Sequence, residues 1–222
     1  MNKKPLLFLA PGTCARVPLI ALEMIGEPFD LKILHLTKGE HKSPAFLHIN
    51  PKGKVPALQI DGETLTENVA ILSYLNERFP QARLLPTSHG LMDRTHFLAD
   101  LAFCAATLHP IVSRICVPHI LAPGAEAALK LPAEKSMRDY FALIDDKLKR
   151  RTWWYGDIWS VLDAYLFWIF NRVEGCGFEV SDFTNYRAHT QRMKKLPAVT
   201  RALAREAQAL ARETLTVEGS TP

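Results

Sequence analysis

A cysteine directly follows a Pro-Gly-Thr turn in the stretch LAPGTCARVPLIAL, residues 9–22. The apolar run before this turn predicts a strand, and the run after it has helical spacing. Pro18 places Cys14 near the start of that helix, because a proline removes the hydrogen bond to the carbonyl four residues earlier. Unpaired N–H groups, the helix dipole and nearby Arg16 favour a thiolate there. We therefore expect a lowered pKa for the Cys14 thiol; a buried packing residue is the alternative.

Two further motifs in the same region could bind a ligand. In GKVPAL, the proline forces Val55 into an extended shape, so its main-chain N–H and C=O could pair with an extended peptide. In LTENVAIL, Glu67 and Asn68 open a helix, where an amide and unpaired N–H groups suit an anion. Each motif alone also fits a purely structural role, as an edge-strand proline and a helix cap. All three sites fall at strand ends or helix starts, where open α/β folds bind ligands.

The elements that would position these residues follow from the hydrophobic pattern. Strands are predicted at PLLFLA and FDLKILHL, with the helix ARVPLIALEMI between them and Gly26 ending it. A strand-helix-strand unit of this length gives two parallel strands. A short helix in KSPAFLHINPKGK precedes VPALQIDGETLT, where Asp61-Gly62 predicts a tight hairpin. The amphipathic helix ENVAILSYLNERF ends at Pro80.

The composition changes after residue 82. Turn-forming residues fill 83–89, and from Leu91 the chain is rich in Ala, Leu, Arg and Glu at helical spacing. We therefore predict an α/β domain over residues 1–82, a linker over 83–89, an all-helical domain over 90–215 and a flexible tail over 216–222. Prolines should break the helices of the second domain, at Pro110, Pro118, Pro123, Pro132 and Pro197.

Composition excludes several classes of protein. The chain has 222 residues, 48% of them hydrophobic, and a formal net charge of +4, which is too weakly basic to indicate a nucleic-acid partner. Its cysteines, Cys14, Cys104, Cys116 and Cys176, lack the spacing of a zinc site, so we expect no metal. The short apolar run after Lys3 and Lys4 does not fit a signal peptide, and no stretch is long enough for a membrane span. We expect a cytoplasmic protein with free thiols and no membrane partner.

Taken together, the motifs resemble those of the cytosolic glutathione transferase family, and the resemblance covers essentially the whole chain. It implies a thioredoxin-like N-terminal domain, in the order β-α-β-α-β-β-α, joined to an all-α C-terminal domain. APGTCARVPLIAL looks like the family's catalytic turn and first helix, with Cys14 where the bacterial beta class has cysteine. KVPAL resembles the segment with the cis proline, here Pro56, in which Val55 pairs with the cysteinyl part of glutathione.

The resemblance implies roles for further residues. LTENVAIL matches the Glu-Ser motif that holds the γ-glutamyl end, although Asn68 replaces the usual serine beside Glu67. HKSPAFLHINPKGK is similar to a loop of theta-like members, which implies that His41 and Lys54, with Lys42 as a weaker candidate, lie near the glycine carboxylate.

In the helical domain, ATLHPIVSR resembles the beta-class helix that brings a histidine towards the cysteine, which makes His109 a catalytic candidate. Arg114 is a further candidate for lining the acceptor site. YGDIWSVLDAYLF matches the family's capping box, so Ser160 and Asp163 are expected to act in folding.

The implied function is conjugation of glutathione, as co-substrate, to small hydrophobic electrophiles by a homodimeric detoxification enzyme. Two alternatives remain open. Cys14 itself could carry out glutathione-dependent thiol-disulfide exchange or peroxide reduction, or the chain could be a binding or regulatory protein that keeps only the fold.

Overall fold

The computed structural model describes residues 4–218, with side chains described up to residue 211. The chain forms two compact units, Met1–Ala82 together with Leu196–Pro222, and Arg83–Lys195. The division after residue 82 coincides with the start of the predicted linker. The C-terminal division differs from the expected domain over 90–215, because the last helix groups with the first unit.

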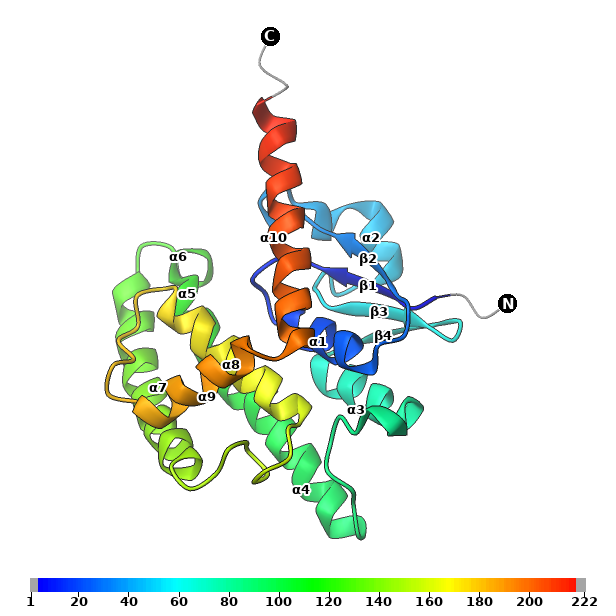
Figure 1. Cartoon of the computed structure of the whole chain (residues 1–222). Helices are drawn as coiled ribbons and strands as arrows, with labels where there is room; N and C mark the ends of the chain where they lie inside the picture. Colours follow the sequence, from blue (N-terminus) through cyan, green and yellow to red (C-terminus); the bar gives the residue numbers. More distant parts are fainter. Residues whose placement is uncertain (1–3, 219–222) are drawn as a thin grey trace. The chain divides into compact units, whose positions relative to one another are not determined.

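The first unit is built on a four-stranded sheet in the order β2-β1-β3-β4 (Figure 1). Strand β1 pairs parallel with β2 and antiparallel with β3, and β3 pairs antiparallel with β4. The elements follow one another as β1 (Leu6–Leu9), α1 (Arg16–Ile25), β2 (Asp30–Ile33), α2 (Pro44–Ile49), β3 (Ala57–Ile60), β4 (Glu63–Thr66) and α3 (Asn68–Arg78). This is the predicted order, and it gives the expected thioredoxin-like arrangement.

Local sequence accounts for the turns of this unit. Gly26 ends α1 with a left-handed φ of 80° and donates its N–H to Leu22. Asp61 and Gly62 both have positive φ, 49° and 88°, which is the geometry of the tight hairpin turn that joins β3 to β4. Three 3₁₀ turns, η1 (Leu36–Lys38), η2 (Glu40–Lys42) and η3 (Pro80–Ala82), complete the connections of the unit.

Helix α10 (Pro197–Glu218) runs beside α1 in the first unit (Figure 1). The Glu23 carboxylate of α1 is 5% exposed and accepts hydrogen bonds from the Nε atoms of Arg201 and Arg205. Residues 216–218 of the predicted tail continue this helix, and residues 219–222 lie outside the described part of the chain.

The regular elements of the second unit are all helices in the described residues, as predicted, apart from one isolated β-bridge between Trp153 and Gly156. Its elements are α4 (Leu91–Ala102), the π-helical turn η4 (Phe103–Leu108), α5 (His109–Cys116), α6 (Pro118–Leu121), α7 (Glu126–Leu148), α8 (Val161–Glu174) and α9 (Thr184–Lys194). Helix α8 is buried along most of its length. Around it, the rings of Phe141, Phe170 and Tyr186 pack at centroid distances of 4.8–5.8 Å.

Two predicted helix breaks are wrong. Pro110 lies within the continuous helical stretch Leu91–Cys116. Pro132 lies inside α7, which continues to Leu148. A proline removes one main-chain hydrogen bond, but the buried residues Met137, Phe141, Ile144 and Leu148 share one face of this helix. Burial of that face stabilises the helix across the proline.

The continuous helical stretch Leu91–Cys116 is long and apolar enough to cross a membrane by length and composition, since 18 consecutive residues within it have a mean hydropathy of 1.3. The expectation that no stretch meets this criterion is therefore wrong. A core helix meets the same criterion, and Asp100 within this stretch accepts hydrogen bonds from the Trp154 indole and the Tyr155 hydroxyl. These polar contacts fit a helix packed in protein.

The expectation of free thiols throughout is also wrong. Cys116, at the end of α5, and Cys176, just after α8, form a disulfide with a Cα–Cα distance of 5.3 Å. They are 60 residues apart in sequence, so only the packing of these helices brings them together. Among the described residues, Cys14 and Cys104 are the free cysteines, and both are buried.

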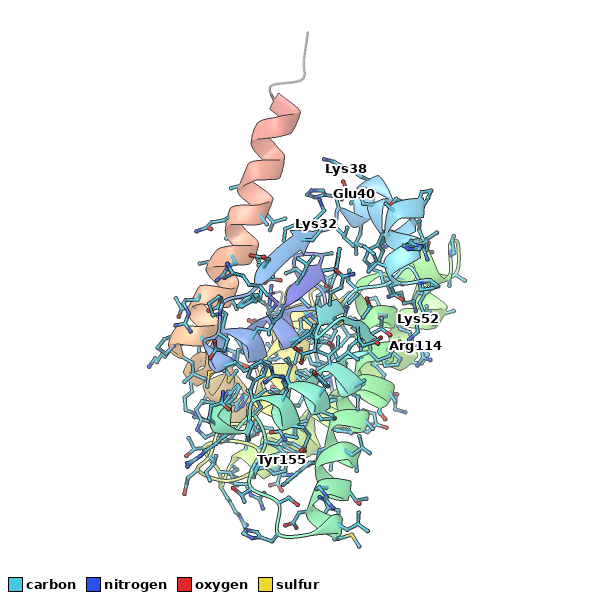
Figure 2. All side chains as sticks on the ribbon, turned by 90° about the vertical axis from the view of Figure 1, so that its right-hand side faces the viewer. Lys32, Lys38, Glu40, Lys52, Arg114 and Tyr155 are labelled. Atoms are coloured by element: carbon cyan, nitrogen blue, oxygen red, sulfur yellow. A yellow bond between two sulfur atoms is a disulfide. The ribbon has the colours of Figure 1, made fainter. Side chains whose placement is uncertain are left out.

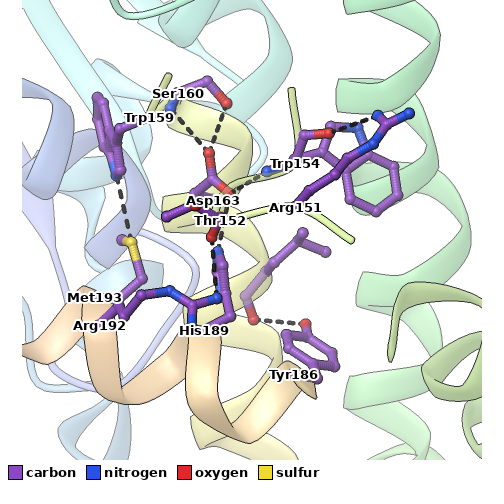
Figure 3. A network of polar contacts seen from close by, with 11 residues as sticks. Arg151, Thr152, Trp154, Trp159, Ser160, Asp163, Tyr186, His189, Arg192 and Met193 are labelled. Atoms are coloured by element: carbon purple, nitrogen blue, oxygen red, sulfur yellow. Dashed lines mark hydrogen bonds and ion pairs between the residues drawn. The ribbon is translucent and has the colours of Figure 1, made fainter. Parts of the chain in front are cut away.

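The start of α8 carries a buried polar network (Figure 3). One oxygen of Asp163 accepts the main-chain N–H and the hydroxyl of Ser160, which forms a capping box. The other oxygen accepts the main-chain N–H of Trp154 at 2.8 Å and lies 2.9 Å from Nε2 of His189. Ser160, Asp163 and His189 are each 0% exposed, so this network fixes the loop before α8 and the packing of α9.

Replacing Asp163 by Ala should destabilise the second unit by about 3 kcal/mol, because it leaves several buried donors without a partner. Ser160→Ala removes one cap contact and should cost about 1 kcal/mol. Urea unfolding followed by tryptophan fluorescence measures both. Asp157→Ala, at an exposed position in the same loop, is the control; equal midpoints for Asp163→Ala and Asp157→Ala would contradict the assignment.

Candidate active site

The turn after β1 places Cys14 immediately before α1. Strand β1 ends at Leu9 and α1 begins at Arg16, with Pro18 in its first turn, so the predicted position at the helix start is confirmed. The side chain is inside the protein, since Cys14 is 7% exposed. Its thiol donates a hydrogen bond to the main-chain carbonyl of Val55, with 3.8 Å between sulfur and oxygen.

The second motif meets this turn through its main chain. The Val55–Pro56 peptide bond is cis, as the family resemblance implied, and β3 begins only at Ala57. Val55 therefore lies ahead of the strand ladder, with its carbonyl facing Cys14. The Asn50 amide holds the preceding residue by donating to the carbonyl of Lys54 at 2.6 Å. An extended peptide could pair with the main chain at this point.

The third motif also contacts Cys14. Helix α3 begins at Asn68, which is 6% exposed and whose amide donates to the Cys14 carbonyl at 3.1 Å. The other end of the same amide, Oδ1, is buried and has no hydrogen-bond partner among the described residues. Glu67 has a positive φ of 70°, which turns the chain sharply into the helix. The three motifs that the sequence singled out are thus in contact with one another.

Glu67 has a partner that the sequence analysis missed. Its exposed carboxylate forms an ion pair with Nζ of Lys52 at 2.6 Å, and the same ammonium donates to the Thr66 hydroxyl at 3.0 Å. Lys52 is labelled in Figure 2, at the surface of the first unit. It lies in the quoted NPKGK stretch, but nothing in its spacing distinguished it from the neighbouring lysines.

The residues predicted to lie near the glycine carboxylate of the ligand come from two loops that pack together. His41 and Lys42 lie in η2, and a Cβ added at Gly53 would come within 2.9 Å of the His41 carbonyl and of the Lys42 ammonium. Gly53 has a φ of 59° and needs both the space and the left-handed conformation. Lys54 follows it with an exposed side chain, so His41, Lys42 and Lys54 share this part of the first unit.

His109 and Arg114 belong to the second unit. His109 begins α5, and its ring packs edge-on against Trp168 with 4.8 Å between centroids. Its catalytic role stays a prediction. Arg114, labelled in Figure 2, lines a cavity of about 630 Å³ between η4, α5 and α7. Its other lining residues are mostly small or apolar: Ala106, Thr107, Pro110, Ile111, Ala128, Leu129, Pro132, Ala133, Ser136 and Tyr140.

The pKa expected for Cys14 is wrong. The pKa of this thiol is raised from 9.0 to about 12, chiefly by burial, because a thiolate inside the protein loses its hydration, and to a smaller extent by the Glu67 carboxylate. The main-chain N–H of Cys14, the Asn68 amide and Lys54 act in the opposite direction but do not outweigh burial. The prediction of a lowered pKa was wrong because it counted the favourable helix dipole but not the cost of removing the thiolate from water. Cys14 is therefore an S–H group at neutral pH.

Within the described part of the chain, no group of three or more His, Cys, Asp or Glu side chains is arranged to hold a metal ion. The chemistry that this site offers comes from an S–H donor, main-chain groups and a solvent-facing carboxylate. Such a site can hold a peptide and place a second thiol beside Cys14.

Known proteins are similar to this chain in sequence. The model of the glutathione S-transferase N-terminal domain matches residues 6–77. Glutathione S-transferase GstA of Escherichia coli O157:H7 is 29% identical over 202 residues, which cover 90% of this chain and 98% of the relative. A maleylpyruvate isomerase of Ralstonia is 33% identical over 165 residues, covering 72% of this chain and 76% of the relative.

A solved structure extends the similarity to three dimensions. The sphingomonad glutathione S-transferase in complex with glutathione is 33% identical, with a TM-score of 0.81 over 91% of this chain and 98% of that one. The fold and the contacts around Cys14 define a protein with a thioredoxin-like unit and a helical unit. With these relatives, they show that the chain belongs to the glutathione S-transferase family.

The raised pKa predicts a slow thiol. Cys14 should react with iodoacetamide at neutral pH much more slowly than free glutathione does, and the rate should rise only above pH 9, where a free cysteine is already ionised. Peptide mass spectrometry separates Cys14 from Cys104.

The same shift has a consequence for stability. The folded pKa lies above the unfolded value, so the contribution of Cys14 to stability is present below pH 9.0 and is lost as the pH rises towards about 12. Wild type should therefore lose more stability over this range than Cys14→Ala. Rapid alkylation at neutral pH, or identical pH profiles for the two proteins, would contradict a protonated Cys14.

Proposed function

We propose that this glutathione transferase conjugates glutathione to a small hydrophobic electrophile and that Cys14 assists as a hydrogen-bond donor. The observation that best supports this proposal is the state of the Cys14 thiol. This thiol is buried, its pKa is raised to about 12, and it donates a hydrogen bond to the Val55 carbonyl beside a cis proline. A group that stays protonated can stabilise a neighbouring thiolate by hydrogen bonding. This role suits Cys14 better than nucleophilic attack.

In the proposed complex, the main chain of Val55, before Pro56, pairs with the cysteinyl part of glutathione. Glu67 and Asn68 take the γ-glutamyl end, where the N–H groups of the first turn of α3 have no partner within the helix. Lys54 and His41 face the glycine carboxylate. Contacts among Cys14, Val55 and Asn68 support this assignment, because they bring the separate motifs into one site.

The chemistry then follows from two donors. The S–H and the main-chain N–H of Cys14 stabilise the glutathione thiolate, whose sulfur attacks the electrophilic carbon. A carbon–sulfur bond forms, the leaving group departs with its electron pair, and the proton of the glutathione thiol passes to solvent. We assign His109 as a second polar group for this step, on the family resemblance alone.

The structure gives little support to thiol exchange or peroxide reduction through Cys14. Both reactions need the thiolate of Cys14 as a nucleophile, and burial opposes its formation. A binding protein without turnover is the remaining alternative. Two measurements would identify such a binding protein: it is retained on immobilised glutathione, and it turns over neither an aromatic electrophile nor a maleyl substrate. The maleyl substrate is chosen from the name of the Ralstonia relative, a maleylpyruvate isomerase.

We propose that the cavity lined by Arg114 and Tyr140 holds the hydrophobic co-substrate. Its volume of about 630 Å³ falls within the usual range for small-molecule pockets, and it is lined by small and apolar residues together with the polar side chains of Thr107, Arg114, Ser136 and Tyr140. Arg114 supplies an exposed cation at this cavity, which favours electrophiles that carry a carboxylate or nitro group.

A homodimer and a cytoplasmic location complete the proposal, both on the family resemblance. The Cys116–Cys176 disulfide is the feature that weighs against a reducing compartment. Counting the free thiols of protein purified without reductant, before and after dithiothreitol, tests this point.

Cys14→Ala should keep conjugation of an aromatic electrophile to within about tenfold in kcat/KM, because it removes one hydrogen bond of about 1 kcal/mol. Cys14→Ser, which keeps an O–H donor, should stay closer to wild type. Any disulfide reductase activity should vanish in both variants. Cys104→Ala, at the other buried free cysteine, is the matched control. Complete loss of conjugation in Cys14→Ala would show that the sulfur itself reacts.

Ala133→Trp should fill the cavity and raise KM for the electrophile about tenfold or more, while KM for glutathione stays unchanged. Ala133 is a buried residue of the cavity wall. Steady-state kinetics with each substrate varied separately measures the two values. Ala142→Trp, at an exposed position of the same helix, is the control. Unchanged electrophile kinetics in a folded Ala133→Trp protein would place the co-substrate elsewhere.

A further inference from the structure

The C-terminal helix contributes a buried carboxylate to the Cys14 turn. Glu206 of α10 is 3% exposed, and its Oε1 accepts the main-chain N–H of Gly12 at 3.0 Å. Its Oε2 accepts Nε of Arg16 at 2.6 Å. Gly12 and Arg16 flank Cys14 on either side, so one carboxylate holds both ends of the turn.

Thr13, Ala15 and Arg16 of this turn have local acceptors for their main-chain N–H groups. Thr13 donates its N–H and its hydroxyl to the Ala10 carbonyl, and Ala15 donates its N–H to the Thr13 hydroxyl. Arg16 donates its N–H to the Thr13 carbonyl. Gly12, with a left-handed φ of 76°, points its N–H away from this local set to Glu206. Glu206 therefore anchors both ends of the turn from 194 residues away in sequence, in addition to the contacts that Cys14 makes with Val55 and Asn68.

This anchor has a chemical consequence. The main-chain N–H of Cys14 acts on its own sulfur, where it lowers the thiol pKa. Its direction depends on the torsions from Gly12 to Arg16, which Glu206 fixes at both ends. Charge-assisted hydrogen bonds to a buried carboxylate are short and directional, which suits this task.

We propose that Glu206 is a positioning residue for glutathione activation, which sets the place and direction of the Cys14 donors without touching substrate. The proposal rests on the proposed function for its effect on turnover. Its effect on the Cys14 thiol itself does not depend on that function.

The fold supplies a matched control. Glu23 is the other buried carboxylate between α1 and α10, is 5% exposed, and accepts hydrogen bonds from Arg201 and Arg205. It joins the same two helices, and within the described part of the chain its hydrogen bonds run to Arg201 and Arg205 and not to the turn. Substitutions at either Glu23 or Glu206 should therefore weaken the packing of α10 on α1. Only substitutions at Glu206 should also disturb the turn that carries Cys14.

The experiment compares Glu206→Ala, Glu206→Asp and Glu206→Gln with Glu23→Ala. Glu206→Ala and Glu206→Asp should lower kcat for conjugation about tenfold with a smaller change in KM for glutathione, because they lose the Gly12 contact. Alkylation of Cys14 should become about tenfold faster as the turn opens to water. Glu206→Gln keeps an acceptor for the Gly12 N–H and should restore most of both values.

Glu23→Ala should lower the urea midpoint by a similar amount but leave kcat and Cys14 alkylation near wild type. The proposal is overturned if folded Glu206→Ala and Glu206→Asp match Glu23→Ala in both readouts. If wild type shows no conjugation at all, the proposed function fails, and the alkylation rates still decide whether Glu206 positions Cys14.

Discussion

Desolvation of the Cys14 sulfur is the constraint on which the site depends. The fold places this thiol against the Val55 carbonyl and beneath the Asn68 amide, where water is largely excluded. A charge on Cys14 itself is therefore costly, and the dipole of α1 does not offset that cost. This cost is why we propose that the site stabilises the thiolate of a bound thiol and not that of Cys14.

This arrangement needs a rigid turn, since hydrogen bonds to sulfur weaken quickly when the donor is misaligned. Local sequence provides part of the rigidity through Thr13, whose hydroxyl bridges the turn. The rest comes from α10, whose Glu206 and its neighbours form ion pairs with α1. The first and last helices of this unit therefore meet beside the turn that carries Cys14.

The sequence predicted the elements well, because their signals are local. Gly26, the Asp61-Gly62 pair and Pro18 each act within a few residues, and each sits where the pattern indicated. It did not predict Glu206 or the Cys116–Cys176 disulfide, because both join segments far apart in the chain. The Cys14 pKa failed for a related reason. Burial is set by the whole fold, whereas the helix dipole can be inferred from position.

Asn68 shows how far a family pattern carries. A serine at this position offers a hydroxyl that can turn towards a ligand, whereas the Asn68 amide is already donating to the Cys14 carbonyl. In the proposed complex, we expect the γ-glutamyl carboxylate to depend more on the main-chain N–H groups at the start of α3 than on the Asn68 side chain. Glu67 has its carboxylate paired to Lys52 at the surface, so a ligand would meet this pair rather than a free carboxylate. Asn68 thus already stabilises the turn that carries Cys14 before any ligand binds.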